Sequence, residues 1–132
     1  MNRARIGRRS GAAAAALAAV ALLAVSASPA SATSNKTISY GDRGYMEFID
    51  DGDVFKLCDI RADGHGVDGY LMRRDGILGG NFQQLWVITN LGGNGTCIKK
   101  AYNIGNSYDY QMQIWWRGDY ADGGVSSDWF NE

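Results

Sequence analysis

Residues 108–118 read YDYQMQIWWRG and show the clearest alternation of apolar and polar side chains in the chain. Successive side chains of a β-strand point to opposite faces of the sheet. One face of this stretch would carry Tyr108, Tyr110, Met112, Ile114 and Trp116, and the other Asp109, Gln111, Gln113, Trp115 and Arg117. One apolar and one polar face are typical of an antiparallel sheet that is buried on one side. The stretch therefore predicts an antiparallel strand that covers the hydrophobic core.

From residue 36 onwards the chain divides into short apolar or alternating segments, separated by turns rich in glycine. None of them shows a sustained helical period. We expect strands at 36–40, 44–50, 54–60, 67–74, 82–90, 96–104, 108–118 and 125–130. Asp51 and Gly52 favour a two-residue hairpin turn, because both residue types tolerate a positive φ. This spacing is typical of an all-β sandwich or barrel, and we predict a single-domain antiparallel β-sandwich of about 6–8 short strands.

The N-terminal segment has the layout of a secretory signal peptide. Four arginines in the first ten residues precede an alanine-rich apolar run, and small residues follow it, with Ala30 and Ala32 as the candidate last residues of the signal. We therefore expect a signal peptide over 1–32 and a secreted, extracellular domain over 33–132. Of 13 lysines and arginines, nine lie in that domain against 14 acids, a formal charge of −5. An acidic domain lacks the basic surface that binds nucleic acid, and we expect no membrane contact after cleavage.

Cys58 and Cys97 are the only two cysteines of the chain. In an oxidising compartment, a lone pair of this kind predicts a disulfide. Closing a loop of this length would stabilise the fold by about 4 kcal/mol in the chain-entropy model. Two sulfurs that lie far apart, with His65 as the only histidine, fall short of a zinc-binding set.

The stretch CDIRADGHGVDG, residues 58–69, is the most polar and glycine-rich part of the chain. Asp59 and Asp63 are candidate calcium ligands, because acidic loops supply the oxygens that this ion needs. Arg61 stands where an EF-hand would have a ligand and no closing glutamate follows, so an EF-hand is excluded. The alternative is a tight turn in which Asp63 accepts hydrogen bonds from its own backbone. His65 lacks a nucleophile in a suitable setting, so we assign no catalytic residue and no cofactor other than possible calcium.

Trp115 offers the best candidate for ligand binding. It shares the polar face of 108–118 with Gln111, Gln113 and Arg117, and a ring beside amides and a guanidinium can stack on a sugar or anchor a protein. The alternative is that Trp115 packs beneath a neighbouring loop. We expect a monomeric, non-enzymatic secreted protein whose ligand is a glycan or an extracellular protein.

Two other functions stay open at this point. An inhibitor of a protease would present an exposed, rigid loop near the disulfide, such as 61–66 or 91–95. A small hydrolase would hold His65 against an acid in a cleft. A calcium-stabilised extracellular module is a further alternative, and it would need Asp59 and Asp63 in one ligand set.

The segment GDVFKLCDIRADGHGVDGYL, residues 52–71, precedes the second cysteine and an aromatic strand near the C-terminus. In this it resembles a group of small secreted proteins of actinomycetes, streptomycetes among them, that carry one disulfide. The resemblance covers about 20 residues and the signal layout, and it implies a single β-sandwich domain. It implies no reaction, because the group has no catalytic set to carry over.

Overall fold

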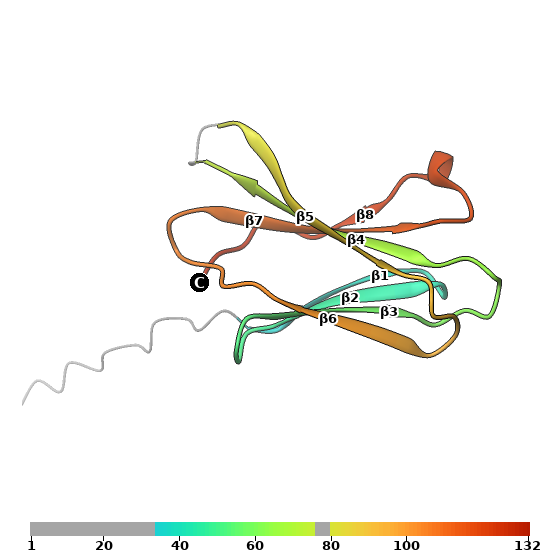
Figure 1. Ribbon diagram of the computed structural model, residues 1–132. Coiled ribbons are helices and arrows are strands. Elements are labelled where there is room, and N and C mark those ends of the chain that lie inside the picture. Colours follow the sequence, from blue (N-terminus) through green and yellow to red (C-terminus); the bar gives the residue numbers. More distant parts are fainter. Residues whose placement is uncertain (1–33, 76–79) are drawn as a thin grey trace, which may run out of the picture.

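The computed structural model describes residues 34–75 and 80–132, and within them the protein is an antiparallel β-sandwich. The first sheet has the order β1-β2-β3-β6 and the second β5-β4-β7-β8, and Figure 1 shows them as two stacked layers. The elements are β1 (Lys36–Tyr40), β2 (Gly44–Ile49), β3 (Val54–Asp59), β4 (Val67–Arg74), β5 (Phe82–Asn90), β6 (Thr96–Ala101), β7 (Asp109–Trp116), a 3₁₀ turn (Tyr120–Asp122) and β8 (Val125–Ser126). The predicted all-β fold is confirmed. The predicted signal peptide over 1–32 lies outside the described residues.

The core lies between the sheets and is filled by the alternate residues of each strand. In β7 the alternation predicted from the sequence is confirmed, because Tyr110, Met112 and Ile114 are buried and the residues between them are half-buried. The core side chains are Ile38, Met46, Phe48, Phe55, Leu57, Val67, Leu71, Ile104, Tyr110, Met112, Ile114 and Phe130. Within the described residues, no helix has the length and apolar character needed to cross a bilayer.

Gly69 allows the two sheets to approach each other closely. It lies on the inner face of β4, where an added Cβ would come within 3.1 Å of the Met46 sulfur and 3.2 Å of a Leu57 methyl group. Glycine has no side chain, so these two residues of the first sheet pack directly against the β4 backbone.

Several predicted bounds differ from the structure, beginning with the two-residue hairpin turn predicted at Asp51 and Gly52. The β2–β3 hairpin has a four-residue loop, since Ile49–Val54 is its last pair, and both Gly52 (φ 90°) and Asp53 (φ 52°) take positive φ. Strand 96–104 ends at Ala101, because its partner β3 begins there at Val54. Strand 125–130 is reduced to the two residues of β8 and a separate bridge between Phe130 and Tyr110. Strand 108–118 is Asp109–Trp116.

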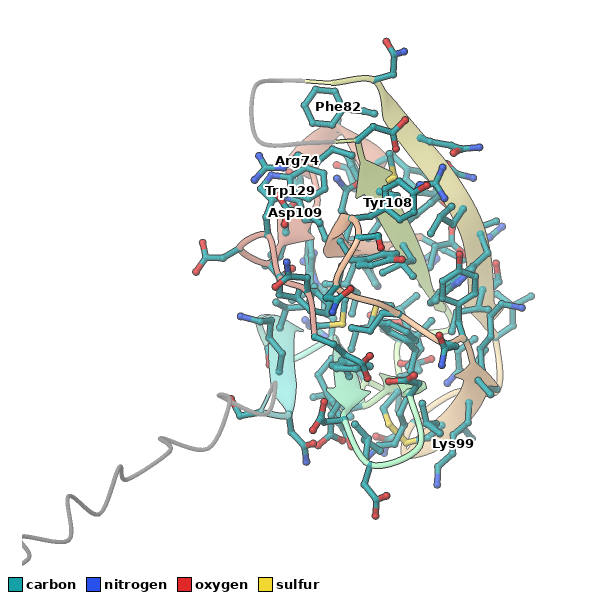
Figure 2. All side chains as sticks on the ribbon, turned by 90° about the vertical axis from the view of Figure 1, so that its left-hand side faces the viewer. Arg74, Phe82, Lys99, Tyr108, Asp109 and Trp129 are labelled. Carbon is teal, nitrogen blue, oxygen red and sulfur yellow. A yellow bond between two sulfur atoms is a disulfide. The ribbon has the colours of Figure 1, made fainter. Side chains whose placement is uncertain are left out.

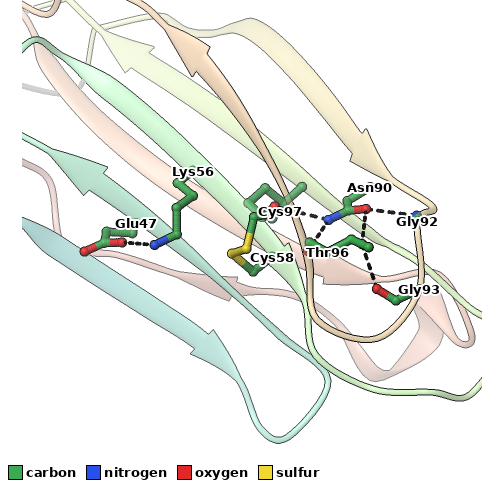
Figure 3. Close-up of a disulfide and its surroundings, with 9 residues drawn as sticks. Glu47, Lys56, Cys58, Asn90, Gly92, Gly93, Thr96 and Cys97 are labelled. Carbon is green, nitrogen blue, oxygen red and sulfur yellow. Dashed lines mark hydrogen bonds and ion pairs between the residues drawn. A yellow bond between two sulfur atoms is a disulfide. The ribbon is translucent and has the colours of Figure 1, made fainter.

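The predicted disulfide is confirmed and lies on the outer face of the first sheet (Figure 3). Cys58 and Cys97 stand directly opposite each other in β3 and β6, with a Cα–Cα distance of 4.1 Å. On the same face, Lys56 donates to Glu47 at 2.8 Å, and this hydrogen bond raises the pKa of the lysine above its ordinary value. The disulfide thus joins an edge strand, β6, to the interior of its sheet.

Asn90 ties the two sheets together at one end of the sandwich (Figure 3). It is the last residue of β5 in the second sheet, and its amide nitrogen donates to the carbonyls of Leu57 and Thr96 in the first. Its amide oxygen accepts from the Gly92 backbone at 2.9 Å. A buried amide with its hydrogen bonds satisfied in this way fixes the relative position of the strands it joins.

Candidate ligand-binding site

The outward side of the second sheet, away from the core, carries the candidate site, and we call it the outer face. The antiparallel register places residues of β5, β4 and β7 side by side in four rows. In the order β5, β4, β7 the rows are Thr89–Asp68–Trp115, Val87–Tyr70–Gln113, Gln84–Met72–Gln111 and Phe82–Arg74–Asp109. Directly opposed residues of neighbouring strands share one face, so aromatic rings, amides and a thioether meet on this surface.

An open hollow of about 310 Å³ lies over the first three rows. It is lined by Tyr70, Met72, Gln84, Gln113, Trp115 and Tyr120. Trp115 and Tyr120 form one wall, with ring centroids 6.4 Å apart and ring planes inclined by 38°. The volume suits a small molecule that contains one polar ring. The hollow is open on one side, so a longer ligand can extend beyond it.

Gly124 supports the ring of Trp115 from behind. An added Cβ at Gly124 would lie 2.5 Å from a carbon of the indole, so the ring packs directly against the backbone there. Trp115 is therefore half-buried, with one part against the segment before β8 and another part lining the hollow. Trp115 thus packs against a neighbouring segment, as one sequence-based alternative predicted, and it also lines an open hollow.

A buried carboxylate holds this end of the outer face together. Asp68 has a side chain that is only 4% exposed. It accepts hydrogen bonds from the Thr89 hydroxyl at 2.6 Å, the Tyr120 hydroxyl at 2.6 Å and the Arg117 guanidinium at 3.1 Å. A buried charge is tolerated when it is paired and hydrogen-bonded. Asp68 therefore holds Tyr120 beside Trp115 through a hydrogen bond, and the positive charge of Arg117 balances the negative charge of its carboxylate.

The ionisation of the neighbouring groups follows from this arrangement. The hydrogen bond to Asp68 raises the pKa of Tyr120 above its ordinary value of 10.0, with burial as the second cause. Burial raises the pKa of Tyr70, and the charge of Asp68 adds to the effect. The hydrogen bond to Asp68 also raises the pKa of Arg117. At neutral pH both phenols are therefore neutral donors, and the guanidinium balances the carboxylate.

The amides on the outer face differ in how far they are engaged. Gln111 donates to the Ser127 carbonyl at 3.0 Å and accepts from the amide nitrogen of Gln113 at 3.1 Å. Within the described residues, no hydrogen bond engages the amide oxygen of Gln113 or either end of the exposed Gln84 side chain. Gln113 and Gln84 thus offer hydrogen-bonding groups to a ligand, while Gln111 orients Gln113.

The four residues predicted for ligand binding occupy different roles in the structure. Trp115 and Gln113 line the hollow, whereas Gln111 and Arg117 support it from the side. Sequence reasoning did not select Asp68, Tyr70, Met72 and Gln84. The period of two along 67–74 places Asp68, Tyr70 and Met72 on one face, so three of them carried a usable signal. The sequence carried no signal for which strands lie beside this one in the sheet.

The loop between β3 and β4 is a turn that packs against the end of β7. Asp63 accepts from the backbone of His65 at 2.9 Å, as the turn interpretation predicts, and also from the indole nitrogen of Trp116 at 3.1 Å. The His65 ring lies edge-on to Trp116, at 5.2 Å between centroids. Asp59 accepts from the backbone of Arg61. Among the residues that the structure describes, no three His, Cys, Asp or Glu side chains are grouped to hold a metal ion, and Asp59 and Asp63 form no such set.

Comparison with known proteins adds no relative: no family model, no curated protein and no solved structure matches this chain. The resemblance to small secreted actinomycete proteins stays a prediction.

Proposed function

We propose that this protein is a secreted, non-enzymatic binding protein whose outer face binds a neutral glycan. The observation that carries the proposal is the hollow in which Trp115, Tyr70 and Tyr120 lie beside the amides of Gln84 and Gln113. An aromatic ring offers a flat apolar surface to the C–H face of a sugar. An amide both donates to and accepts from hydroxyl groups, which are themselves donors and acceptors.

The charge distribution favours a neutral ligand over a charged one. Asp68 and Arg117, whose side chains lie beside the lining residue Tyr120, are paired with each other at 3.1 Å. The hollow itself is lined by neutral side chains only. A site for a phosphate or a carboxylate would present an unpaired cation to it, so binding should depend little on ionic strength.

Trp115→Ala tests this proposal directly. The native protein should bind a neutral polysaccharide in isothermal titration calorimetry or affinity electrophoresis, and the variant should bind at least about tenfold more weakly, as is usual for a central aromatic contact. Tyr45→Ala is the matched control, because Tyr45 is a half-buried aromatic on the outer side of the first sheet. Native protein that binds no neutral polysaccharide, or equal loss in both variants, would contradict the proposal.

Secretion is tested independently of binding. The mass of the protein collected from the culture medium should correspond to a chain that begins after Ala30 or Ala32, with Cys58 and Cys97 oxidised. The disulfide supports this part of the proposal, because disulfides persist in oxidising compartments. Full-length protein retained in the cell would argue against export.

A second candidate is inhibition of a protease through the loop 91–95. Leu91 is 69% exposed there, and the loop is held by the hydrogen bond that the Gly92 backbone donates to Asn90 and by the nearby disulfide. An exposed apolar side chain on a rigid loop suits the pocket of a protein partner. Leu91→Asp should abolish inhibition of a panel of secreted proteases and leave glycan binding unchanged. If the native protein inhibits no member of the panel, this candidate is dropped.

A further inference from the structure

A second aromatic cluster occupies the opposite end of the outer face. Phe82 and Trp129 lie with ring centroids 5.6 Å apart, and the guanidinium of Arg74 lies 4.5 Å from the Trp129 ring. Figure 2 shows Phe82, Arg74, Trp129 and Asp109 gathered at this end of the second sheet, far from Lys99. Phe82 is 64% exposed and forms an apolar patch with Trp129, and contiguous apolar patches of this kind mark binding surfaces.

The charges in this second cluster are paired, as they are at the hollow. Arg74 forms an ion pair with Asp109 at 2.8 Å, with both side chains about three-quarters buried. The cation therefore supports the indole of Trp129 from one side and has its charge balanced from the other. What remains for a ligand is the exposed phenyl ring of Phe82 and the neighbouring indole.

The register joins the two aromatic ends into one surface. Phe82 belongs to the row of Arg74, and Trp115 to the row of Asp68. From Asp68 to Arg74 the chain of β4 advances by six residue steps, a distance of about 20 Å at 3.3 Å per step. The two rows between them hold only neutral side chains, and both belong to the hollow or border it. A single sugar cannot reach both ends, whereas a chain of several sugars can.

We infer that the ligand is a linear neutral polysaccharide that lies along β4, with one sugar stacked near Trp115 and another near Phe82 and Trp129. This inference rests on the proposed function and specifies the class of glycan that is bound. An extended peptide fits this surface less well, because a peptide strand binds through free backbone groups at a sheet edge. In the centre of the outer face β4 is paired on both sides, by β5 and β7, so only side chains are on offer.

The test measures affinity as a function of oligosaccharide length for the native protein, for two single variants and for the double variant. The probes are neutral oligosaccharides of β-linked glucose and of β-linked N-acetylglucosamine, from the disaccharide to the octasaccharide. Phe82→Ala removes the far contact with little effect on folding, because its side chain is mostly exposed. The affinity of the native protein should rise with the length of the oligosaccharide. Phe82→Ala should lower the affinity for the octasaccharide about tenfold and leave the affinity for the disaccharide unchanged. Trp115→Ala should weaken the binding of both oligosaccharides. In the double variant Trp115→Ala/Phe82→Ala, the factors by which the single variants weaken octasaccharide binding should multiply.

Each alternative outcome has a distinct meaning. Binding that needs Trp115 but is indifferent to chain length and to Phe82→Ala overturns the linear-chain inference and leaves the proposed function intact. Absence of binding to every oligosaccharide and polysaccharide overturns both. Leu91→Ala serves as the matched control for loss of an exposed apolar side chain outside this surface, since Leu91 is 69% exposed. A loss of octasaccharide affinity in this control equal to that of Phe82→Ala would also overturn the inference.

Discussion

Replacing Asn90 with alanine tests whether one buried amide holds the two sheets in register. Asn90 as a whole residue is only 2% exposed, so water competes little for its hydrogen bonds in the folded state. It donates to the Leu57 carbonyl at 3.2 Å and the Thr96 carbonyl at 2.7 Å, and it accepts from the Gly92 amide at 2.9 Å. The Thr96 hydroxyl lies 3.0 Å from the amide oxygen and 2.7 Å from the Gly93 carbonyl, and its single proton serves one of them at a time.

Three full hydrogen bonds are therefore lost in Asn90→Ala. At about 1 kcal/mol for each hydrogen bond, the free energy of unfolding should fall by about 3 kcal/mol. A small domain has only about 5–15 kcal/mol of stability in total, so the change should be large in any unfolding assay.

Urea unfolding followed by tryptophan fluorescence measures the difference. The midpoint should fall while the slope of the transition stays unchanged, because the variant exposes the same surface on unfolding. Asn94→Ala is the control, since Asn94 is exposed on the adjoining turn, and it should change the stability by no more than about 0.5 kcal/mol. A loss below about 1 kcal/mol in Asn90→Ala would refute the view that this residue joins the sheets.

Four further predictions address the disulfide, the carboxylate network, the tyrosine and the sheet packing. Replacing both Cys58 and Cys97 with serine should lower the stability by about 4 kcal/mol, measured by urea unfolding against the native protein with and without reductant. Asp68→Ala should cost about 2–3 kcal/mol and also weaken ligand binding, because it removes the acceptor shared by two hydroxyls and a guanidinium. The raised pKa of Tyr120 means that its hydrogen bond contributes fully below its ordinary pKa of 10.0 and is lost as pH rises through the folded-state value; the stability difference between the native protein and Tyr120→Phe should therefore be constant near neutrality and shrink above about pH 10. Gly69→Val should cost about 1–3 kcal/mol by forcing the sheets apart, and a thermal midpoint equal to that of the native protein would contradict the packing argument.

Much of the fold was predictable because it depends on local patterns. The alternation along 108–118 places Met112 and Ile114 inward and Trp115 outward, whatever the neighbouring strands are. The positive φ at Gly52 follows from the residue type in the same way. The length of the hairpin loop was less predictable, because it depends on where the pairing of Ile49 with Val54 stops.

The candidate site was predictable only in part. Trp115 and Gln113 were recognised from their own strand, and both line the hollow. Asp68 was not recognised. In the sequence it is an aspartate in an alternating segment, which is also what a solvent-exposed acid looks like, and only the structure shows its hydrogen-bond partners. Arg117 was recognised as a polar neighbour, whereas its charge proved to be engaged by Asp68 across the β4–β7 pair.

The sequence by itself determined the strand-rich composition, the single disulfide pair and the inward and outward faces of β7, since each depends on residue type or on a period of two along the chain. Only the tertiary structure decided that β4 lies between β5 and β7 in one sheet, and that β6 pairs with β3 in the other. Strand order depends on contacts between residues far apart in the chain, where backbone hydrogen bonds are the same for every pairing and side-chain packing selects among them. The aromatic rows of the outer face arise from that selection, because they exist only when these three strands lie side by side.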